Sequence, residues 1–278
     1  MSEWFFTSDL HGQGALYEQL IAIVAAQQPR AVIIGGDLAP HSGGADGIAR
    51  QRVFLEGFLV EFARRLAEAS PASTLLLMMG NDDWAVNQDC LERHEGGLWR
   101  VLHERMVRVD GVPVAGLSWV PITPGTLKDW ERWDDGEPET PARLEGWVSG
   151  ARGLTPHRFD PAHRQPTIAG ALAALASRTP VAETVFVLHS PPRDTHCDMI
   201  GARTHVGSRA IRAFIEHTQP PLVLAGHIHE SPRVSSSYRD TIGATVAVNP
   251  GQFGTQRLCG VWFDPARVGE SLRHTVYP

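Results

Sequence analysis

Cysteine, lysine and long apolar runs are scarce in this 278-residue chain, and each scarcity excludes a class of protein. The three cysteines (Cys90, Cys197 and Cys259) are far apart, odd in number and without CxxC spacing, which argues against a disulfide scaffold and for a reducing compartment. No apolar run approaches the length of a membrane span. The first residues lack the basic segment and the apolar core of a signal peptide. We therefore expect a cytoplasmic protein with no membrane partner.

The charge of the chain argues against a nucleic-acid-binding protein. The formal net charge is -6, only Lys128 is a lysine, and the arginines are scattered. This balance gives no electrostatic basis for binding nucleic acid. With 42% hydrophobic and 20% charged residues, the composition is that of an ordinary globular protein. We expect one domain over residues 1–278, because no internal repeat and no linker interrupts the chain; nothing in the sequence indicates an oligomeric state.

The segment from Ala31 to Asp37 organises the rest of the pattern. Its apolar, β-branched residues predict a strand that is buried on both faces. Gly35 and Gly36 follow, where the chain can turn sharply, and then comes the carboxylate of Asp37. Open α/β sheets bind ligands just past the carboxyl ends of their strands. Asp37 is therefore a candidate site residue.

Four more predicted strands end in the same way. Each is a short apolar or aromatic run followed by residue types that bind metal ions. The runs are 4–8, 74–79, 185–188 and 222–225, and the residues that follow them are Asp9 with His11, Asn81, His189, and His227 with His229. With Asp37 they form a set of seven candidate ligands.

Other segments complete the predicted α/β pattern. Helical spacing predicts a long helix with Val53, Phe54, Phe58, Phe62 and Leu66 on one stripe. A hairpin is predicted over 107–119 around an Asp-Gly turn, and a helix over 167–177. Ser208 is a plausible N-cap for the next helix. The tail 245–276 reads as short strands and turns, which suggests a second sheet.

Periodicity is lost between residues 121 and 165. The stretch has six prolines, many charges and three tryptophans (Trp130, Trp133 and Trp147). It is too long for a simple connection. Two interpretations stand side by side: a lid that contacts the substrate, and a solvated loop whose tryptophans pack onto the body.

The seven candidate ligands suit Mn, Fe or Zn, because they are carboxylates, imidazoles and one carboxamide. Asp9/His11 and His227/His229 are pairs two residues apart, and in an extended segment both side chains of such a pair point the same way. Seven ligands exceed the needs of one ion and suit two. A two-ion site can hold a hydroxide between the ions and stabilise both the attacking and the leaving oxygen of a displacement. Asp37 is our candidate for the bridging carboxylate.

These motifs resemble the five ordered motifs of the calcineurin-like metallophosphoesterase superfamily. They are Asp9-Leu10-His11, Gly35-Gly36-Asp37, Gly80-Asn81-Asp82, Leu188-His189 and Gly226-His227-Ile228-His229. The resemblance implies a four-layer α/β/β/α sandwich of two mixed sheets. It also implies one ion on Asp9, His11, Asp37 and His229, and a second on Asp37, Asn81, His189 and His227. The segments 188–194, 205–208 and 226–231 are similar to a bacterial and archaeal subgroup.

One position departs from the family pattern. The family usually has Gly-Asn-His followed by an acidic residue, and that histidine protonates the leaving oxygen or stabilises phosphate charge. Here Asp82 stands in its place, followed by Asp83. An ionised carboxylate repels a phosphate and has no proton to donate, so Asp82 needs a raised pKa to act as an acid. His196 or His205 could take the role instead.

The resemblance implies a binuclear metal-dependent phosphoesterase, and we expect a phosphodiesterase acting on a small molecule or a nucleotide. Asp82, His11 and Asn81 are the expected catalytic residues. Arg193, Arg209 and His205 are candidates for binding the substrate, since a guanidinium can bind two phosphate oxygens at once. An alternative is a scaffold or protein-binding module with this fold and little or no turnover. A repair-type nuclease fits poorly with the acidic balance.

Overall fold

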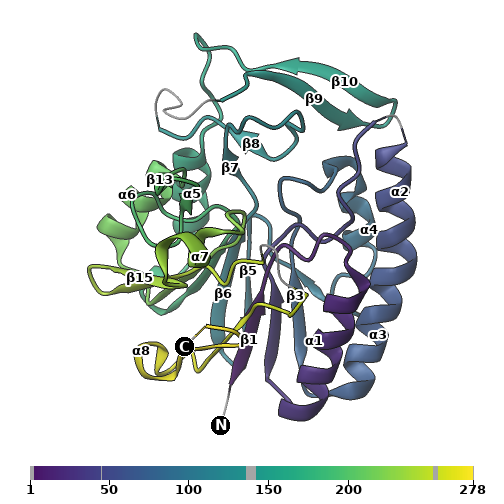
Figure 1. The fold of residues 1–278 in the computed structure, drawn as a ribbon, viewed down its shortest axis with the longest axis vertical. Coiled ribbons are helices and arrows are strands. Elements are labelled where there is room, and N and C mark those ends of the chain that lie inside the picture. The colour runs from purple at the N-terminus through teal and green to yellow at the C-terminus, as the bar shows by residue number, and fades with distance from the viewer. Residues whose placement is uncertain (1–2, 45, 136–141, 253–255, 278) are drawn as a thin grey trace.

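A computed structural model of the chain describes residues 3–44, 46–135, 142–252 and 256–277. Its described part contains two six-stranded mixed sheets (Figure 1). The first has the strand order β18 (Arg273–His274), β17 (Val261–Phe263), β1 (Trp4–Thr7), β2 (Ala31–Ile34), β3 (Thr74–Leu77) and β4 (Arg100–Val101). The second has the order β15 (Arg239–Ile242), β16 (Thr245–Val248), β14 (Leu222–Leu224), β11 (Val185–Leu188), β6 (Val112–Leu117) and β5 (Arg105–Val109).

The helices cover the outer faces of the two sheets. The helical segments are α1 (Gly14–Gln27), α2 (Gly47–Val53), η1 (Phe54–Leu59), α3 (Val60–Ala69), η2 (Ala85–Asn87), α4 (Gln88–Glu92), α5 (Ile168–Ala176), η3 (Val181–Glu183), α6 (Arg209–Thr218), α7 (Ser231–Ser235) and α8 (Val268–Ser271). None of the helices in the described ranges is long and apolar enough to cross a membrane.

Side chains that point alternately to the two faces of each sheet explain why the protein has four layers. In β1, Phe5 packs in the cluster shared with α1 and α3, whereas Trp4 and Phe6 belong to the cluster between the sheets. In β11, Phe186 packs with α5 and α6, and Val187 faces the other sheet. Successive side chains of a strand point to opposite faces, so a strand with no polar position is buried on both. The predicted four-layer arrangement of helices, two mixed sheets and helices is confirmed.

Several local predictions hold. The 107–119 hairpin is formed by β5 and β6, and the helix expected over 167–177 is α5. The Ser208 hydroxyl accepts a hydrogen bond from the Ile211 N–H at the start of α6, as an N-cap does.

Two predictions are corrected. Val53 is 72% exposed and does not belong to the apolar stripe of its helix. The residue before Phe54 is rotated by about 100° around a helix of 3.6 residues per turn, and that rotation turns Val53 toward solvent. The strands of the tail 245–276 do not form a sheet of their own: β16 joins the second sheet, while β17 and β18 pair beside β1 in the first. Residues 253–255 of the tail lie outside the described residues.

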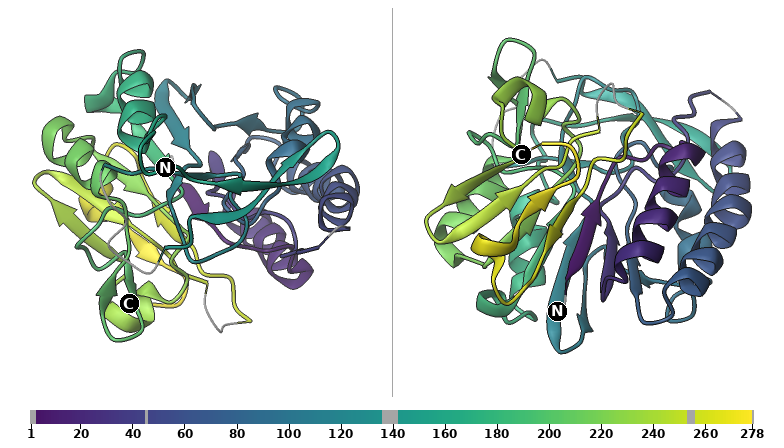
Figure 2. Two further views of the ribbon diagram at one scale, coloured as in Figure 1. Left: turned by 90° about the horizontal axis from the view of Figure 1, so that it is seen from above. Right: turned by 60° about the horizontal axis from the view of Figure 1, so that its bottom comes forward.

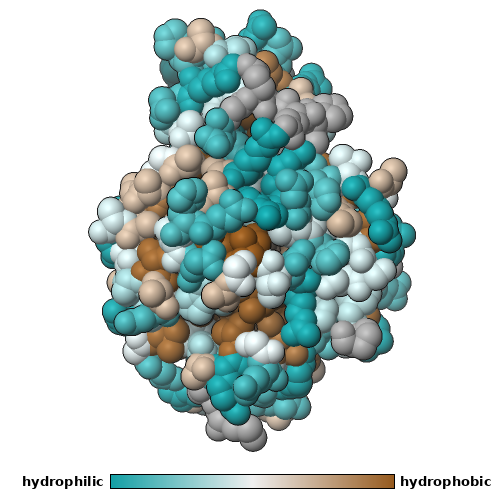
Figure 3. Space-filling view, turned by 90° about the vertical axis from the view of Figure 1, so that its left-hand side faces the viewer, coloured by the Kyte–Doolittle hydropathy of each residue, from teal (hydrophilic) through white to brown (hydrophobic). Residues whose placement is uncertain are grey.

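The stretch 121–165 is more ordered than its sequence predicts. It contains the antiparallel hairpin β9 (Glu145–Gly150) and β10 (Gly153–Arg158) and the short strands β7 (Val120–Pro121) and β8 (Glu131–Arg132). Its residues 136–141 lie outside the described residues. Viewed from above, the hairpin crosses the end of the molecule where the sheet strands end (Figure 2). The face toward α5 and α6 shows this end as mostly hydrophilic, with the apolar surface gathered lower on the body (Figure 3).

One short pair of strands lies in the loop after β11. It consists of β12 (Met199–Ile200) and β13 (Thr204–His205).

Candidate metal centre

All seven candidate ligands lie just past the carboxyl ends of parallel strands, where the sequence places them. β1, β2 and β3 run parallel in the first sheet, and β11 and β14 run parallel in the second. A backbone contact joins the two sheets at this edge: the His227 N–H lies 3.1 Å from both carboxylate oxygens of Asp9. The five motifs therefore meet at one place.

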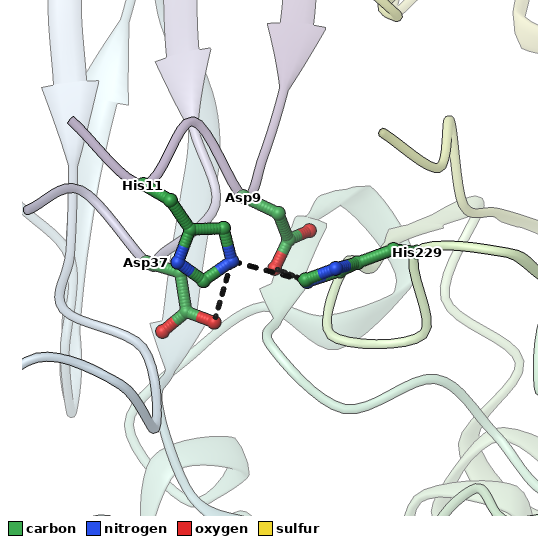
Figure 4. Close-up of side chains that lie close together, drawn as sticks. All are labelled: Asp9, His11, Asp37 and His229. Atoms are coloured by element: carbon green, nitrogen blue, oxygen red, sulfur yellow. Dashed lines mark hydrogen bonds and ion pairs between the residues drawn. The ribbon is translucent and has the colours of Figure 1, made fainter. Parts of the chain in front are cut away.

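Four of the seven side chains form the first group (Figure 4). The donor atoms of Asp9, His11, Asp37 and His229 all lie within 4.8 Å of one another. The Nε2 atoms of His11 and His229 are 3.2 Å apart, and His229 Nε2 is 3.3 Å from Asp9 Oδ1. His11 Nε2 is 3.7 Å from Asp37 Oδ2. These side chains point at one another rather than into solvent.

The other three side chains meet on the far side of Asp37. Asn81 Oδ1 lies 3.0 Å from His189 Nε2 and 2.5 Å from His227 Nδ1. His189 Nε2 is 3.5 Å from Asp37 Oδ2, the same oxygen that faces His11. Because Asp37 Oδ2 faces both groups, it has the position that a bridging ligand requires. The other oxygen, Asp37 Oδ1, accepts a hydrogen bond of 2.8 Å from the Asp82 N–H.

The donor set and its spacing fit metal ions. Imidazole nitrogens and carboxylate oxygens bind zinc at about 2.0–2.2 Å, so two donors on one ion lie no more than about 4.4 Å apart. The contacts of 3.2, 3.3 and 3.7 Å around His11 Nε2 and His229 Nε2 fall within that limit. The His189 Nδ1 lies 2.8 Å from the Gly35 carbonyl oxygen, which fixes the proton on Nδ1 and leaves Nε2 as a donor atom.

The charges around Asn81, His189 and His227 favour the binding of a cation. Burial opposes the charged form of His189, but the Asp37 carboxylate outweighs it and raises the pKa of the imidazole to about 9. Burial, assisted by the charge of His189, lowers the pKa of His227 to about 3. His227 is therefore neutral, which is the form that ligates a metal. A metal ion competes with the proton on His189, because a ligating imidazole must be neutral.

The backbone at the site is strained. Four of the seven candidates have left-handed backbone: Asp9 (φ 62), His11 (φ 43), Asp37 (φ 52) and His227 (φ 64). Such conformations cost non-glycine residues of the order of 1–3 kcal/mol each and cluster at functional sites. This strain also corrects the expectation of extended i,i+2 pairs. In the second pair, His227 turns toward Asn81, whereas His229 turns toward Asp9.

Two motif glycines make room for the ligands. A Cβ on Gly36, whose φ is +120, would come within 2.5 Å of His189 Nδ1. A Cβ on Gly226 would overlap Asp9 Oδ2. Both approaches are closer than any real contact, so a side chain at either position would displace a ligand.

Asp82 and Asp83 have different environments. Asp83 is fully buried, and its carboxylate accepts hydrogen bonds from the N–H groups of Leu38, Ala39 and Gly80. It joins the loop after Asp37 to the loop before Asn81, which is a structural role. Burial and the nearby Asp37 charge raise the pKa of Asp83 to about 7. Burial and Asp37, rather than Asp83, also raise the pKa of Asp82.

Sequence reasoning missed His41. Its Nδ1 is 3.1 Å from Asp82 Oδ2, and its side chain is 74% exposed. Asp82 Oδ1 in turn accepts a hydrogen bond from Asn81 Nδ2, which directs Asn81 Oδ1 toward His189 and His227. The signal for His41 in the sequence is weak: it follows Asp37 by four residues, but no motif includes it.

The two histidines considered as substitutes for the motif histidine pair elsewhere. His196 Nδ1 is 3.1 Å from Asp240, and His205 Nδ1 is 2.7 Å from the buried Asp198. Asp198 also accepts backbone hydrogen bonds from Asp194, Thr195 and Gly207, so it orients this loop.

A cavity of about 890 Å³ opens beside Asn81 and Asp82. Its other lining residues come from the loop at 41–44, from Trp84, and from residues 123–127, 147 and 152–154 of the insert. Among the described residues that line it, none is Arg193, Arg209 or His205. Arg193 Nε is 3.8 Å from Asp194, and Arg209 lies exposed at the start of α6. Substrate binding by these three residues stays a prediction.

Comparison with known proteins identifies a family and a fold. The sequence profile described as calcineurin-like phosphoesterase matches residues 5–231. No curated protein matches the chain in sequence. One crystal structure is 15% identical to this chain with a TM-score of 0.66, and the match covers 100% of this chain and 99% of the other. The crystal structure of TT1561 from Thermus thermophilus is 19% identical with a TM-score of 0.56, covering 98% and 97%. At these identities the two structures show the fold alone.

Proposed function

The chain belongs to the calcineurin-like phosphoesterase family, and from that premise we propose that it is a binuclear metal-dependent phosphodiesterase of small-molecule or nucleotide esters. The observation that carries the proposal is that Asp37 Oδ2 faces both groups of candidate ligands, 3.7 Å from His11 Nε2 and 3.5 Å from His189 Nε2. Four of the seven candidate ligands have left-handed backbone, and strain of this kind clusters at functional sites, which supports the proposal.

The residues divide between two ions. Asp9, His11, Asp37 and His229 would hold one, and Asp37, Asn81, His189 and His227 would hold the other. When bound, the ions supply Lewis-acid activation of water and neutralise the charge of the phosphoester oxygens. Since Asp9 and Asp37 are the only carboxylates in this set, two dications leave a net positive charge that attracts an anionic ester.

Asp82 supports a preference for diesters over monoesters. Its carboxylate is next to Asn81 and 3.9 Å from His11 Nδ1, so a phosphate held between the two candidate ions would lie near it. A monoester carries up to two negative charges and a diester one. Repulsion by Asp82 therefore penalises the monoester more.

The contact between Asp82 and His41 supplies the proton donor that the motif lacks. An ionised carboxylate only accepts, so the His41 Nδ1–H donates to Asp82. In the imidazolium form the opposite nitrogen, Nε2, also carries a proton; it would pass that proton to the leaving oxygen, which leaves neutral His41 still donating to Asp82 through Nδ1. A carboxylate that fixes the tautomer of a histidine acid or base is a recurrent catalytic arrangement. We assign His41 as the general acid and Asp82 as the residue that positions it.

A scaffold or protein-binding module is the alternative function, and the replacement of the motif histidine by Asp82 is the observation that favours it. The test is an assay of manganese-reconstituted protein with aryl phosphodiesters and aryl phosphomonoesters side by side, followed by cyclic nucleotides. We expect metal-dependent turnover with a higher kcat/KM for the diester. Metal-loaded protein that hydrolyses neither ester supports the scaffold, and a higher kcat/KM for the monoester contradicts the role given to the Asp82 charge.

A further inference from the structure

The cavity beside Asn81 and Asp82 has features that the hydrolysis of a phosphoester does not require. Its volume of about 890 Å³ lies in the range of pockets that enclose whole small molecules, roughly 300–1,000 Å³. Asn81 is the candidate metal ligand that lines it, so a phosphoester held at the candidate metal centre would lie at one end of the cavity. The remainder extends under the β9–β10 hairpin and is available to the organic part of the substrate.

The hairpin is fixed over this cavity. Asp129 accepts hydrogen bonds from the Ala85 N–H at 2.8 Å and from the Ser149 N–H at 2.7 Å, which ties β9 to the segment after Asp83. The Ser149 hydroxyl accepts from the Val86 N–H at 2.9 Å. The cavity wall is therefore preorganised, which lowers the entropic cost of binding.

Backbone contacts hold Trp147 at the cavity wall. Its N–H donates to the Thr126 carbonyl at 2.8 Å, and its carbonyl accepts from the Lys128 N–H at 2.9 Å. A Cβ on Gly146 would overlap the Thr126 oxygen, so only glycine lets the two segments approach so closely. The position of Trp147 is built into the insert.

Trp147 lines the cavity and has an exposed aromatic side chain. Its side chain is 43% exposed, whereas the other tryptophan in the wall, Trp84, is 2% exposed and donates its indole N–H to the Ser42 carbonyl. Within the described ranges, the indole N–H of Trp147 has no hydrogen-bond partner. An exposed aromatic ring in a fixed cavity wall is typical of a surface on which a planar ligand stacks.

Arg152 adds a positive charge to the same wall. It lies at the turn between β9 and β10 and lines the cavity with Trp147. No carboxylate in the part of the chain that the structure describes pairs with it. By contrast, Arg158 at the other end of β10 pairs with Glu145 at 3.6 Å. An unneutralised guanidinium in a ligand cavity favours an anionic group.

We propose that Trp147 and Arg152 form a specificity site for a nucleotide-like substrate, in which a planar base stacks on Trp147 and a second phosphate binds Arg152. The inference rests on the proposed function, because it places the scissile phosphate on the metal ions. It adds the chemical class of the rest of the substrate, which has an aromatic base and a further anionic group rather than an aliphatic group or a sugar alone.

Calorimetric titration of the manganese-reconstituted protein tests this binding without turnover. The probes are inorganic phosphate, adenosine 5′-monophosphate and adenosine 3′,5′-bisphosphate. We expect affinity to rise in that order. Trp147→Ala should weaken both nucleotides about tenfold, as expected for the loss of one stacked base, and Trp147→Phe should retain most of the affinity. Arg152→Ala should weaken the bisphosphate about fivefold and the monophosphate little. Arg158→Ala is the matched control and should change none of the three.

The outcomes separate this inference from the proposed function. Equal affinity of the wild-type protein for phosphate and both nucleotides overturns the specificity site even if the enzyme hydrolyses aryl diesters. Equal weakening of phosphate and nucleotides by Trp147→Ala also overturns it, since the ring would then support the metal centre and not the base. Tight, Trp147-dependent nucleotide binding without any ester hydrolysis upholds the site and contradicts the phosphodiesterase.

Discussion

Replacing His41 by asparagine removes the proposed proton donor while keeping a side chain that can still hydrogen-bond to Asp82. An aryloxide with a low pKa leaves without a proton, whereas an alkoxide or ribose oxygen needs one. General acid assistance is worth roughly 10²–10⁴-fold. His41 is 74% exposed, so water can take over part of its role and we expect the lower end of that range. The predicted loss is about 10²-fold in kcat for an alkyl diester, about 2.7 kcal/mol.

The assay compares kcat for a series of diesters whose leaving groups span a wide range of pKa. In His41→Asn, the rate should depend more steeply on leaving-group pKa, with bis(4-nitrophenyl) phosphate nearly unaffected. His196→Asn is the matched control, because His196 has the same 3.1 Å contact to an aspartate but pairs with Asp240. An unchanged slope in His41→Asn, or an equal effect of His196→Asn, would refute the assignment.

A double-mutant cycle distinguishes His41 from Asp82 as the acid. If Asp82 positions His41, Asp82→Asn should cost less than His41→Asn, and the double variant should be no slower than His41→Asn alone. The pKa of Asp82 is raised by burial and by Asp37, so the carboxyl group itself is the competing candidate. Full loss of rate on poor leaving groups in Asp82→Asn, with little loss in His41→Asn, would show that Asp82 delivers the proton.

Three further outcomes follow from the site. Asp37→Ala should abolish activity and lower the melting temperature of the metal-loaded protein, since bound metal stabilises only the folded state; metal analysis and thermal unfolding check this, and retention of both ions would refute bridging. Asp83→Ala should lower the free energy of unfolding by at least about 3 kcal/mol in denaturant titrations, because three buried N–H groups lose their acceptor. Asp82→His, which restores the family residue, should speed hydrolysis of poor leaving groups with unchanged metal content; slower turnover would show that the histidine needs a different setting.

The position of the candidate metal centre was predictable because it depends on a simple rule. Short apolar strands identify themselves in the sequence, and the carboxyl ends of parallel strands share an edge of the sheet. Asp37 and His189 could therefore be placed together although they are far apart along the chain. The metal content itself does not follow from that rule and stays a proposal.

The details around the site were not predictable from local patterns. The left-handed backbone at Asp9 and His227 depends on packing between two sheets, so the extended geometry assumed for the i,i+2 pairs was wrong. The β9–β10 hairpin shows no alternation of apolar and polar residues, because most of its side chains are partly exposed. Its order comes from contacts such as those of Asp129 with Ala85 and Ser149, which no periodicity reveals.

The contact between His41 and Asp82 was also not predictable from local sequence patterns. It joins residues 41 positions apart through a loop whose course is set by tertiary hydrogen bonds. Two of these hydrogen bonds come from the buried Gln51 side chain, which donates to the carbonyls of Pro40 and Asp82. A motif search sees the missing histidine at position 82 but cannot see an imidazole that arrives from another loop.

The metal content of the purified protein tests the central claim most directly. After mild reconstitution with manganese, elemental analysis should give about two ions per chain in the wild-type protein. His229→Ala and His227→Ala should each reduce the content to about one, because they belong to different ligand groups. One ion or fewer in the wild-type protein, or two ions retained in both variants, would contradict the binuclear centre.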